Sequence, residues 1–129
     1  MRLLLDSHIL MAILRRNVRT TGAAIARLLD DAGNEKIASS ASFWEMAIKH
    51  RLSKLALPIP LASLPAYFAA LEYTLLPVTP FHAVEDLDDP PPTRDPFDRL
   101  LLAQCQVEGL RFVTVDRALI GHPLAWRGP

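Results

Sequence analysis

Short apolar runs alternate with helical segments along the whole chain, and this alternation constrains the fold more than any other feature of the sequence. Each run has the length of one strand, and a helical segment separates it from the next. Strands arranged in this way, and buried on both faces, form the parallel sheet of an α/β domain. The expected strands are residues 2–5, 36–39, 75–78 and 111–115.

Capping and turn residues set the expected helix boundaries. Thr20 or Thr21 can cap a helix that Gly33 stops. Thr79 and Asp95 each precede a proline, and proline suits the first position of a helix. The expected helices, the last of them ended by Gly109, are residues 7–15, 23–31, 42–52, 64–71, one that opens at 79–80, and 97–108. The expected irregular segments are residues 88–93, with three prolines, and 121–129.

The length and the charge distribution of the chain limit which functions it can have. A chain of 129 residues, half of them hydrophobic, fits one domain over residues 1–129. The 14 basic and 14 acidic side chains cancel, so net charge gives no argument for nucleic-acid binding. Residues 1–54 hold nine basic and five acidic side chains, a net charge of +4. Residues 72–98 hold one basic and seven acidic side chains (−6), and residues 99–129 hold four basic and two acidic side chains (+2). This distribution allows both a cation site and a polyanion surface.

The ends and the middle of the chain suggest a cytoplasmic location. Cys105 is the single cysteine, so no disulfide can form within the chain. The first apolar run is three residues long and ends at Asp6, which is too short for a secretion signal. Residues 55–71 are uncharged, but three prolines make them a poor membrane span. We expect this apolar segment to be covered by a partner or by the domain's own core.

Acidic residues directly follow the first and last expected strands. Asp6 follows residues 2–5, and Asp116 follows residues 111–115. In an open parallel sheet, ligands bind beyond the carboxyl ends of the strands, so neighbouring strands would place both carboxylates in one crevice. The alternative is that each aspartate caps a helix or makes a turn.

Asp98 lies in the first turn of the helix that Asp95 opens. It shares a helical stripe with Leu101, Leu102 and Cys105, which must face the core, so the stripe carries Asp98 inward. Interaction with the helix dipole is the structural alternative. Asp95 is expected either to cap this helix or to support the site without binding the metal directly.

Glu45 completes a candidate set of four acids. It aligns with Ile48 and Leu52 beside a buried face, but Ser42 and Glu45 can also form a capping box. Two carboxylates about 4 Å apart repel by about 4 kcal/mol at an effective dielectric constant near 20, so a cluster must take up protons or a cation. Oxygen ligands favour Mg²⁺ or Mn²⁺, whereas no Cys-x-x-Cys motif or paired histidines suggest zinc.

Acid-bound Mg²⁺ suits hydrolysis of a phosphodiester. The sequence has no GxxxxGK[ST], GxGxxG or Gly-x-Ser-x-Gly motif, which disfavours nucleotide hydrolysis, dinucleotide binding and serine catalysis. Basic residues near the acids, among them Arg94 and Arg99, could contact phosphates or could simply be solvated. The aromatic residues near the acids are expected in the core rather than in a stacking role: Phe43, Trp44 and Phe97.

Five segments occur in an order that resembles the PIN-domain nucleases, and specifically the VapC-like toxins with a DPFDR signature. The segments are LLLDSH, SASFWEMAIK, LPVTPFHA, RDPFDRLLLAQC and FVTVD, which span roughly residues 2–118. The resemblance implies a three-layer α/β/α domain with a central parallel sheet. It also implies an Mg²⁺- or Mn²⁺-dependent endoribonuclease, with the metal held by Asp6, Glu45, Asp98 and Asp116.

The resemblance extends to supporting residues and partners. Ser7 stands where the family commonly has threonine, Thr114 matches a recurrent polar position, and Asp95 is an added acid of the subgroup. The family implies an RNA substrate, a homodimer and inhibition by a small antitoxin, with DNA contacted only through that antitoxin. Many relatives carry a further acid or asparagine after the last motif, whereas Arg117 follows Asp116 here, so chemistry with one metal stays open.

Two other functions remain open from the sequence. A degenerate PIN fold could bind RNA or protein without catalysis, although all four acids are present. A phosphotransfer domain could use Asp6 as its nucleophile, but such folds pair it with a second acid nearby and a distal lysine. Here Ser7 and His8 follow Asp6, and no lysine occurs after Lys54.

Overall fold

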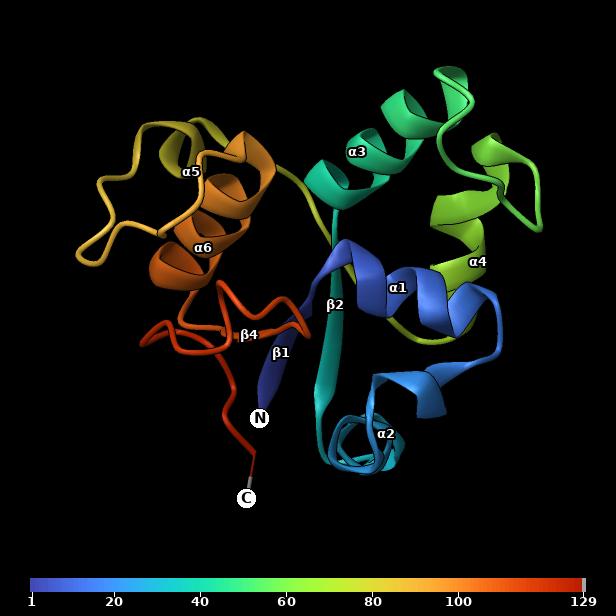
Figure 1. Cartoon of the computed structure of the whole chain (residues 1–129), viewed down its shortest axis with the longest axis horizontal. Helices are drawn as coiled ribbons and strands as arrows, with labels where there is room; N and C mark the ends of the chain where they lie inside the picture. Colours follow the sequence, from blue (N-terminus) through green and yellow to red (C-terminus); the bar gives the residue numbers. More distant parts are fainter. Residues whose placement is uncertain (129) are drawn as a thin grey trace.

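Four parallel strands form the centre of the molecule in the order β3-β2-β1-β4 (Figure 1). The computed structural model describes residues 1–128. The strands are β1 Arg2–Leu5, β2 Glu35–Ser39, β3 Thr74–Leu76 and β4 Arg111–Val113. Leu4 of β1 is in register with Ile37 of β2 and Phe112 of β4, so the first and last strands are neighbours. A parallel sheet was expected, and it is confirmed.

Helices cover both faces of the sheet. They are α1 Ser7–Leu14, α2 Ala23–Asp30, α3 Ser40–Arg51, α4 Leu64–Ala70, α5 Pro80–Val84 and α6 Pro96–Glu108, with 3-10 turns at η1 Val18–Thr21 and η2 Leu61–Ser63. Leu3 and Leu5 pack against α1, α2 and α4, whereas Leu4 packs against α6 on the other face. Because successive strand side chains point to opposite faces, the run of three leucines is buried between the two helical layers. This is the expected three-layer α/β/α arrangement.

The ends of two strands differ from expectation. β3 covers Thr74–Leu76 rather than residues 75–78, because Pro77 has no backbone N–H to donate to a neighbouring strand. β4 ends at Val113 rather than at residue 115. The backbone after Val113 instead turns at Thr114, whose hydroxyl accepts a hydrogen bond from the Asp116 N–H.

The cap of α2 was predicted wrongly, although the helix begins at residue 23 as expected. Neither Thr20 nor Thr21 caps this helix, because their hydroxyls donate to the backbone carbonyls of Asn17 and Val18. Gly22 precedes the helix at φ 110°, a conformation that side chains disfavour. Gly33 does not stop the helix, which ends at Asp30; the Asp31 carboxylate accepts from the Gly33 N–H in the following turn.

The uncharged segment of residues 55–71 packs on the domain's own core. Leu55, Leu57, Ile59 and Leu61 are partly buried against the core cluster, and Phe68 of α4 is fully buried in it. No helix within residues 1–128 is both long and apolar enough to span a membrane.

The segment expected to be irregular, residues 121–129, is tied to the sheet as far as the structure describes it. Ala125 bridges to Phe112, and the Trp126 N–H donates to the Phe112 carbonyl at 2.8 Å. The backbone therefore extends the sheet beside β4 by one short contact, while residue 129 lies outside the described part of the chain.

Candidate active site

The carboxyl ends of β1 and β4 bring Asp6 next to Thr114. The Asp6 N–H donates to the Val113 carbonyl at 2.9 Å, which continues the ladder between the two strands. Asp6 is buried; its Oδ1 accepts from the Ser7 N–H at 2.7 Å, and its Oδ2 accepts from the Thr114 hydroxyl at 2.7 Å. Asp6 therefore caps α1, which is the structural role considered for it from the sequence. It also lies where β1 and β4 end.

Asp116 is joined to the same edge through Thr114. Its N–H donates to the Thr114 hydroxyl at 3.1 Å, and its Oδ1 accepts from the Ala118 N–H at 2.9 Å. Asp116 is half-buried. One carboxylate oxygen therefore shapes a turn, while the threonine fixes the position of both aspartates.

Glu45 of α3 is joined to the site through Ser7. The Ser7 hydroxyl donates to Glu45 Oε1 at 2.5 Å, and the Lys49 Nζ donates to Oε2 at 2.7 Å. Glu45 is buried, so this ion pair with Lys49 compensates a charge that would otherwise be costly. The same contact to Glu45 raises the pKa of Lys49 above its usual value.

The capping box proposed for Ser42 and Glu45 is absent. Ser39 caps α3, since its hydroxyl accepts from the Ala41 N–H at 3.0 Å. Ser42 and Glu45 lie inside the helix, and the buried Ser42 hydroxyl has no hydrogen-bond partner among residues 1–128. The burial of Glu45 is therefore not explained by a capping role.

Asp98 lies half-buried in the first turn of α6, close enough to the other acids to sense their charge. Burial, and after it the carboxylates of Asp95, Asp6 and Asp116, together raise its pKa to about 6. The Thr93 hydroxyl donates to Asp98 Oδ2 at 2.9 Å and opposes this shift. Sequence reasoning missed Thr93, because a threonine in a proline-rich loop has no periodicity that assigns it to a site.

Asp95 and Arg99 lie at the margins of the acidic site. Asp95 is exposed and caps α6, its Oδ1 accepting from the Phe97 N–H at 2.8 Å. Arg99 is exposed and lines a cavity of about 300 Å³ whose other walls come from α5 and α6. None of the four acids lines that cavity, so Arg99 is not gathered with them.

The four acids share one end of the sheet without forming a closed cage. Within residues 1–128, no three carboxylate, imidazole or thiol groups lie close enough together to enclose a metal ion. The expected single pocket is therefore not fully assembled. The donors at this edge are nonetheless carboxylate and hydroxyl oxygens, and burial together with the neighbouring carboxylates disfavours the charged form of Asp98. Both properties fit a hard divalent cation.

Two further side chains, His8 and Trp44, lie close to the acids in sequence. Nδ1 of the exposed His8 lies 4.0 Å from Asp6 Oδ2, and this carboxylate raises the pKa of His8. Trp44, expected in the core, is 61% exposed instead. Its ring makes a T-shaped contact with Phe97, with centroids 5.9 Å apart and planes at 77°.

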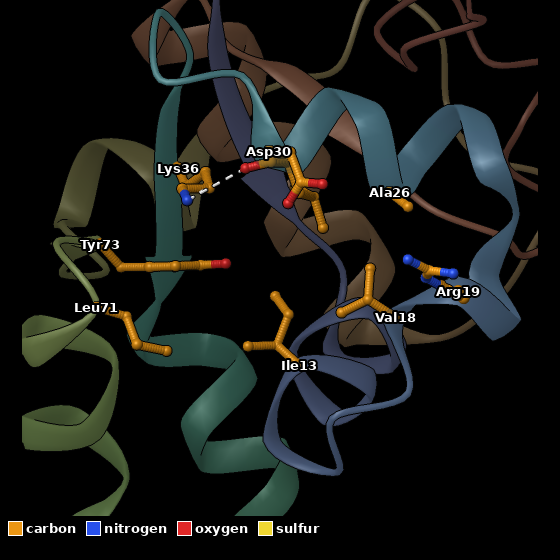
Figure 2. A pocket seen from close by; sticks show the side chains of 9 residues that line it. Ile13, Val18, Arg19, Ala26, Asp30, Lys36, Leu71 and Tyr73 are labelled. Carbon is orange, nitrogen blue, oxygen red and sulfur yellow. Dashed lines mark hydrogen bonds between the residues drawn. The ribbon is translucent and has the colours of Figure 1, made fainter.

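A separate hollow of about 440 Å³ lies between α2, η1 and the chain near β3 (Figure 2). Figure 2 shows the Tyr73 hydroxyl extending into it, between Lys36 and Ile13. The Lys36 ammonium lies 5.2 Å from the Tyr73 ring centroid and donates to the Leu29 carbonyl at 3.3 Å. None of the four acids lines this hollow, so it is distinct from the carboxylate site.

Comparisons with known proteins agree with this fold. The family model described as PIN domain matches residues 3–121. Among solved structures, a chain in the crystal structure of VapBC2 from Rickettsia felis, bound to a DNA fragment from their promoter, superposes with a TM-score of 0.62 at 14% sequence identity. The match covers 97% of this chain and 96% of the other, which establishes a shared fold. None of the curated proteins matches this sequence.

Proposed function

This chain belongs to the PIN-domain family, and from that membership we propose that it is an Mg²⁺-dependent endoribonuclease serving as the toxin of a toxin–antitoxin pair. PIN domains are generally nucleases, and a toxin of the VapC type is the function that the acidic site supports best. The RNA substrate, the metal and the partners are parts of this proposal.

One observation carries the proposal: a continuous series of hydrogen bonds links Glu45, Ser7, Asp6 and Thr114 across three elements. Its links are the Ser7 hydroxyl to Glu45, the Ser7 N–H to Asp6, and the Thr114 hydroxyl to Asp6. Buried carboxylates are normally held so firmly only where their charge is needed, because burial of each one is costly. Burial and the carboxylates of Asp95, Asp6 and Asp116 raise the pKa of Asp98.

We propose that Asp6, Glu45, Asp98 and Asp116 hold the cation. When bound, a divalent cation supplies charge stabilisation at the phosphate and an activated water. The protein's own groups prepare the acids for this task. Thr114 and the first turn of α1 fix both oxygens of Asp6, and Lys49 balances the charge of Glu45. Ser7 sets the distance between the two carboxylates by contacting both residues.

Substrate contacts would come from neutral and cationic groups around this acidic centre. Arg94 and Arg99 are exposed and flank the first turn of α6 in sequence. We propose that they contact RNA phosphates, which would contribute affinity rather than sequence choice.

The proposed partners are an antitoxin and a second copy of the chain. The similar structure contains VapBC2 with promoter DNA, and by analogy an antitoxin would bind this chain and would make any DNA contacts. Exposed apolar side chains on α5, Phe81 at 75% and Val84 at 79%, support an interface of the kind that a homodimer uses. A cytoplasmic location would bring the enzyme to its RNA.

Cleavage of RNA by the purified chain tests the proposal. We expect Mg²⁺ to support the appearance of internal cleavage products and EDTA to abolish it. Asp6→Asn should remove cleavage while its circular dichroism spectrum stays that of the wild type. Cleavage that persists in EDTA or in Asp6→Asn would contradict the metal mechanism. RNA binding without any cleavage would favour the non-catalytic module instead.

A further inference from the structure

Trp44 stands out among the exposed apolar side chains because of where it lies. It precedes Glu45 in the second turn of α3, and Figure 1 shows this helix directly following β2. Single exposed apolar residues are ordinary on protein surfaces. An indole that is 61% exposed, on the residue directly before a buried carboxylate of the candidate site, calls for a different explanation.

Phe97 of α6 contacts the indole of Trp44. The two rings meet in a T-shaped contact across α3 and α6, with centroids 5.9 Å apart. Phe97 is half-buried and directly precedes Asp98, just as Trp44 directly precedes Glu45. A T-shaped contact occupies at most one face of the indole, so the pair forms a braced aromatic surface from the residues that precede two of the four acids in sequence.

The charge around this surface limits which part of an RNA it can hold. Carboxylates repel phosphates, and the nearby Lys49 ammonium is already paired with Glu45 at 2.7 Å. A nucleobase carries no charge, and aromatic side chains bind unpaired bases by stacking. The surface therefore suits a base better than a phosphate.

We propose that Trp44, braced by Phe97, is the stacking platform for an unpaired base of single-stranded RNA beside the cleavage site. This inference rests on the proposed ribonuclease function and names a substrate contact for it. A second copy of the chain is the competing occupant of this surface, and a measurement of self-association separates it from RNA.

Binding can be measured without cleavage and without the metal. Trp126 is the only other tryptophan, so Trp126→Phe leaves Trp44 as the single indole. In EDTA, an oligouridylate of about ten nucleotides should quench its fluorescence. An abasic oligonucleotide of equal length should quench much less, since it keeps the phosphates and lacks the bases. Equal quenching by both oligonucleotides, or by neither, would overturn the platform.

Cleavage kinetics give the second readout. Loss of one stacked base costs about 1–3 kcal/mol, so Trp44→Ala should raise KM roughly 5- to 150-fold with a smaller change in kcat. Trp44→Phe should restore most of the affinity. Leu52→Ala, which removes an apolar side chain of comparable exposure (59%) from the C-terminal end of α3, should leave KM unchanged. An unchanged KM in Trp44→Ala would contradict the proposal.

The remaining outcomes separate this inference from the function on which it rests. If the wild type cuts RNA, but Trp44→Ala alters only self-association in sedimentation, the platform is wrong and the nuclease stands. If base-dependent quenching occurs without any cleavage, the platform stands and the nuclease is wrong.

Discussion

The hydroxyl of Thr114 donates a 2.7 Å hydrogen bond to Oδ2 of Asp6, although 108 positions separate the two residues in the sequence. The contact exists because β1 and β4 are parallel neighbours, so that the residues following both strands meet at one edge of the sheet. The same hydroxyl accepts from the Asp116 N–H. One threonine thereby orients two of the proposed metal-binding aspartates.

Replacement of Thr114 by valine should weaken both cleavage and stability. Valine keeps the shape but leaves the buried Asp6 Oδ2 and the Asp116 N–H without their partner. The lost bond involves a charged acceptor, so we expect a fall of about 2 kcal/mol in the free energy of unfolding, measured in urea. Thr114→Ser keeps the hydroxyl and should recover most of the loss. A valine variant as stable and active as the wild type would show that this contact does not position Asp6.

Asp98 should make the metal-free protein less stable as pH rises. Its folded pKa of about 6 exceeds the ordinary value of 3.8, first because of burial and then because of Asp95, Asp6 and Asp116. The folded state therefore binds the proton more tightly, so stability is present below pH 4 and is lost as pH rises through 6. Asp98→Asn removes this loss. After allowance for its partial exposure, the variant should gain on the order of 1 kcal/mol at pH 7.

Urea unfolding of the wild type and Asp98→Asn across this pH range checks the prediction. The two curves should coincide near pH 4 and diverge up to about pH 7. A difference that is the same at every pH would mean that the carboxyl group does not titrate in the expected range. Carbon-13 NMR of the aspartate carboxyl groups would give the pKa directly.

Gln104 should contribute to stability through a buried polar contact on the far side of the sheet from α1. Its Oε1 accepts from the Ser39 hydroxyl at 2.6 Å, and Ser39 in turn caps α3. Gln104→Leu leaves that hydroxyl without its acceptor, which should cost about 2 kcal/mol in the free energy of unfolding. Gln106→Leu is the matched control, because the hydrogen bonds of Gln106 lie at the surface and should matter less. Equal losses in the two variants would contradict the argument.

Cys105 should be unreactive until the chain unfolds. The thiol is fully buried on α6, and burial raises its pKa far above its usual value, so the reactive thiolate is scarce. A thiol reagent such as DTNB should label the native protein only at the rate of unfolding, and should label it at once in urea. Rapid stoichiometric labelling of the native protein would show that the core around α6 opens readily.

The sequence predicted those features that a few neighbouring residues decide. The capping aspartate and the proline at residues 95–96, with Gly109 in the left-handed conformation, set the ends of α6 to within one residue. The apolar run at Leu3–Leu5 predicted a strand buried on both faces. Local patterns gave the wrong N-cap for α3, because two nearby serines could both serve. Ser39 rather than Ser42 caps this helix, since the helix begins directly after β2.

Sequence alone predicted most of the strands and helices, since caps, prolines and apolar periodicity act over one or two turns of chain, and the role of the four acids stays a prediction. Tertiary structure decided which strands are neighbours, and hence that Thr114 meets Asp6 and that Ser7 joins Asp6 to Glu45. It also decided that Trp44 lies at the surface. The physical reason is that burial is a property of the assembled layers: which face of a helix is covered depends on segments that lie far away in the sequence.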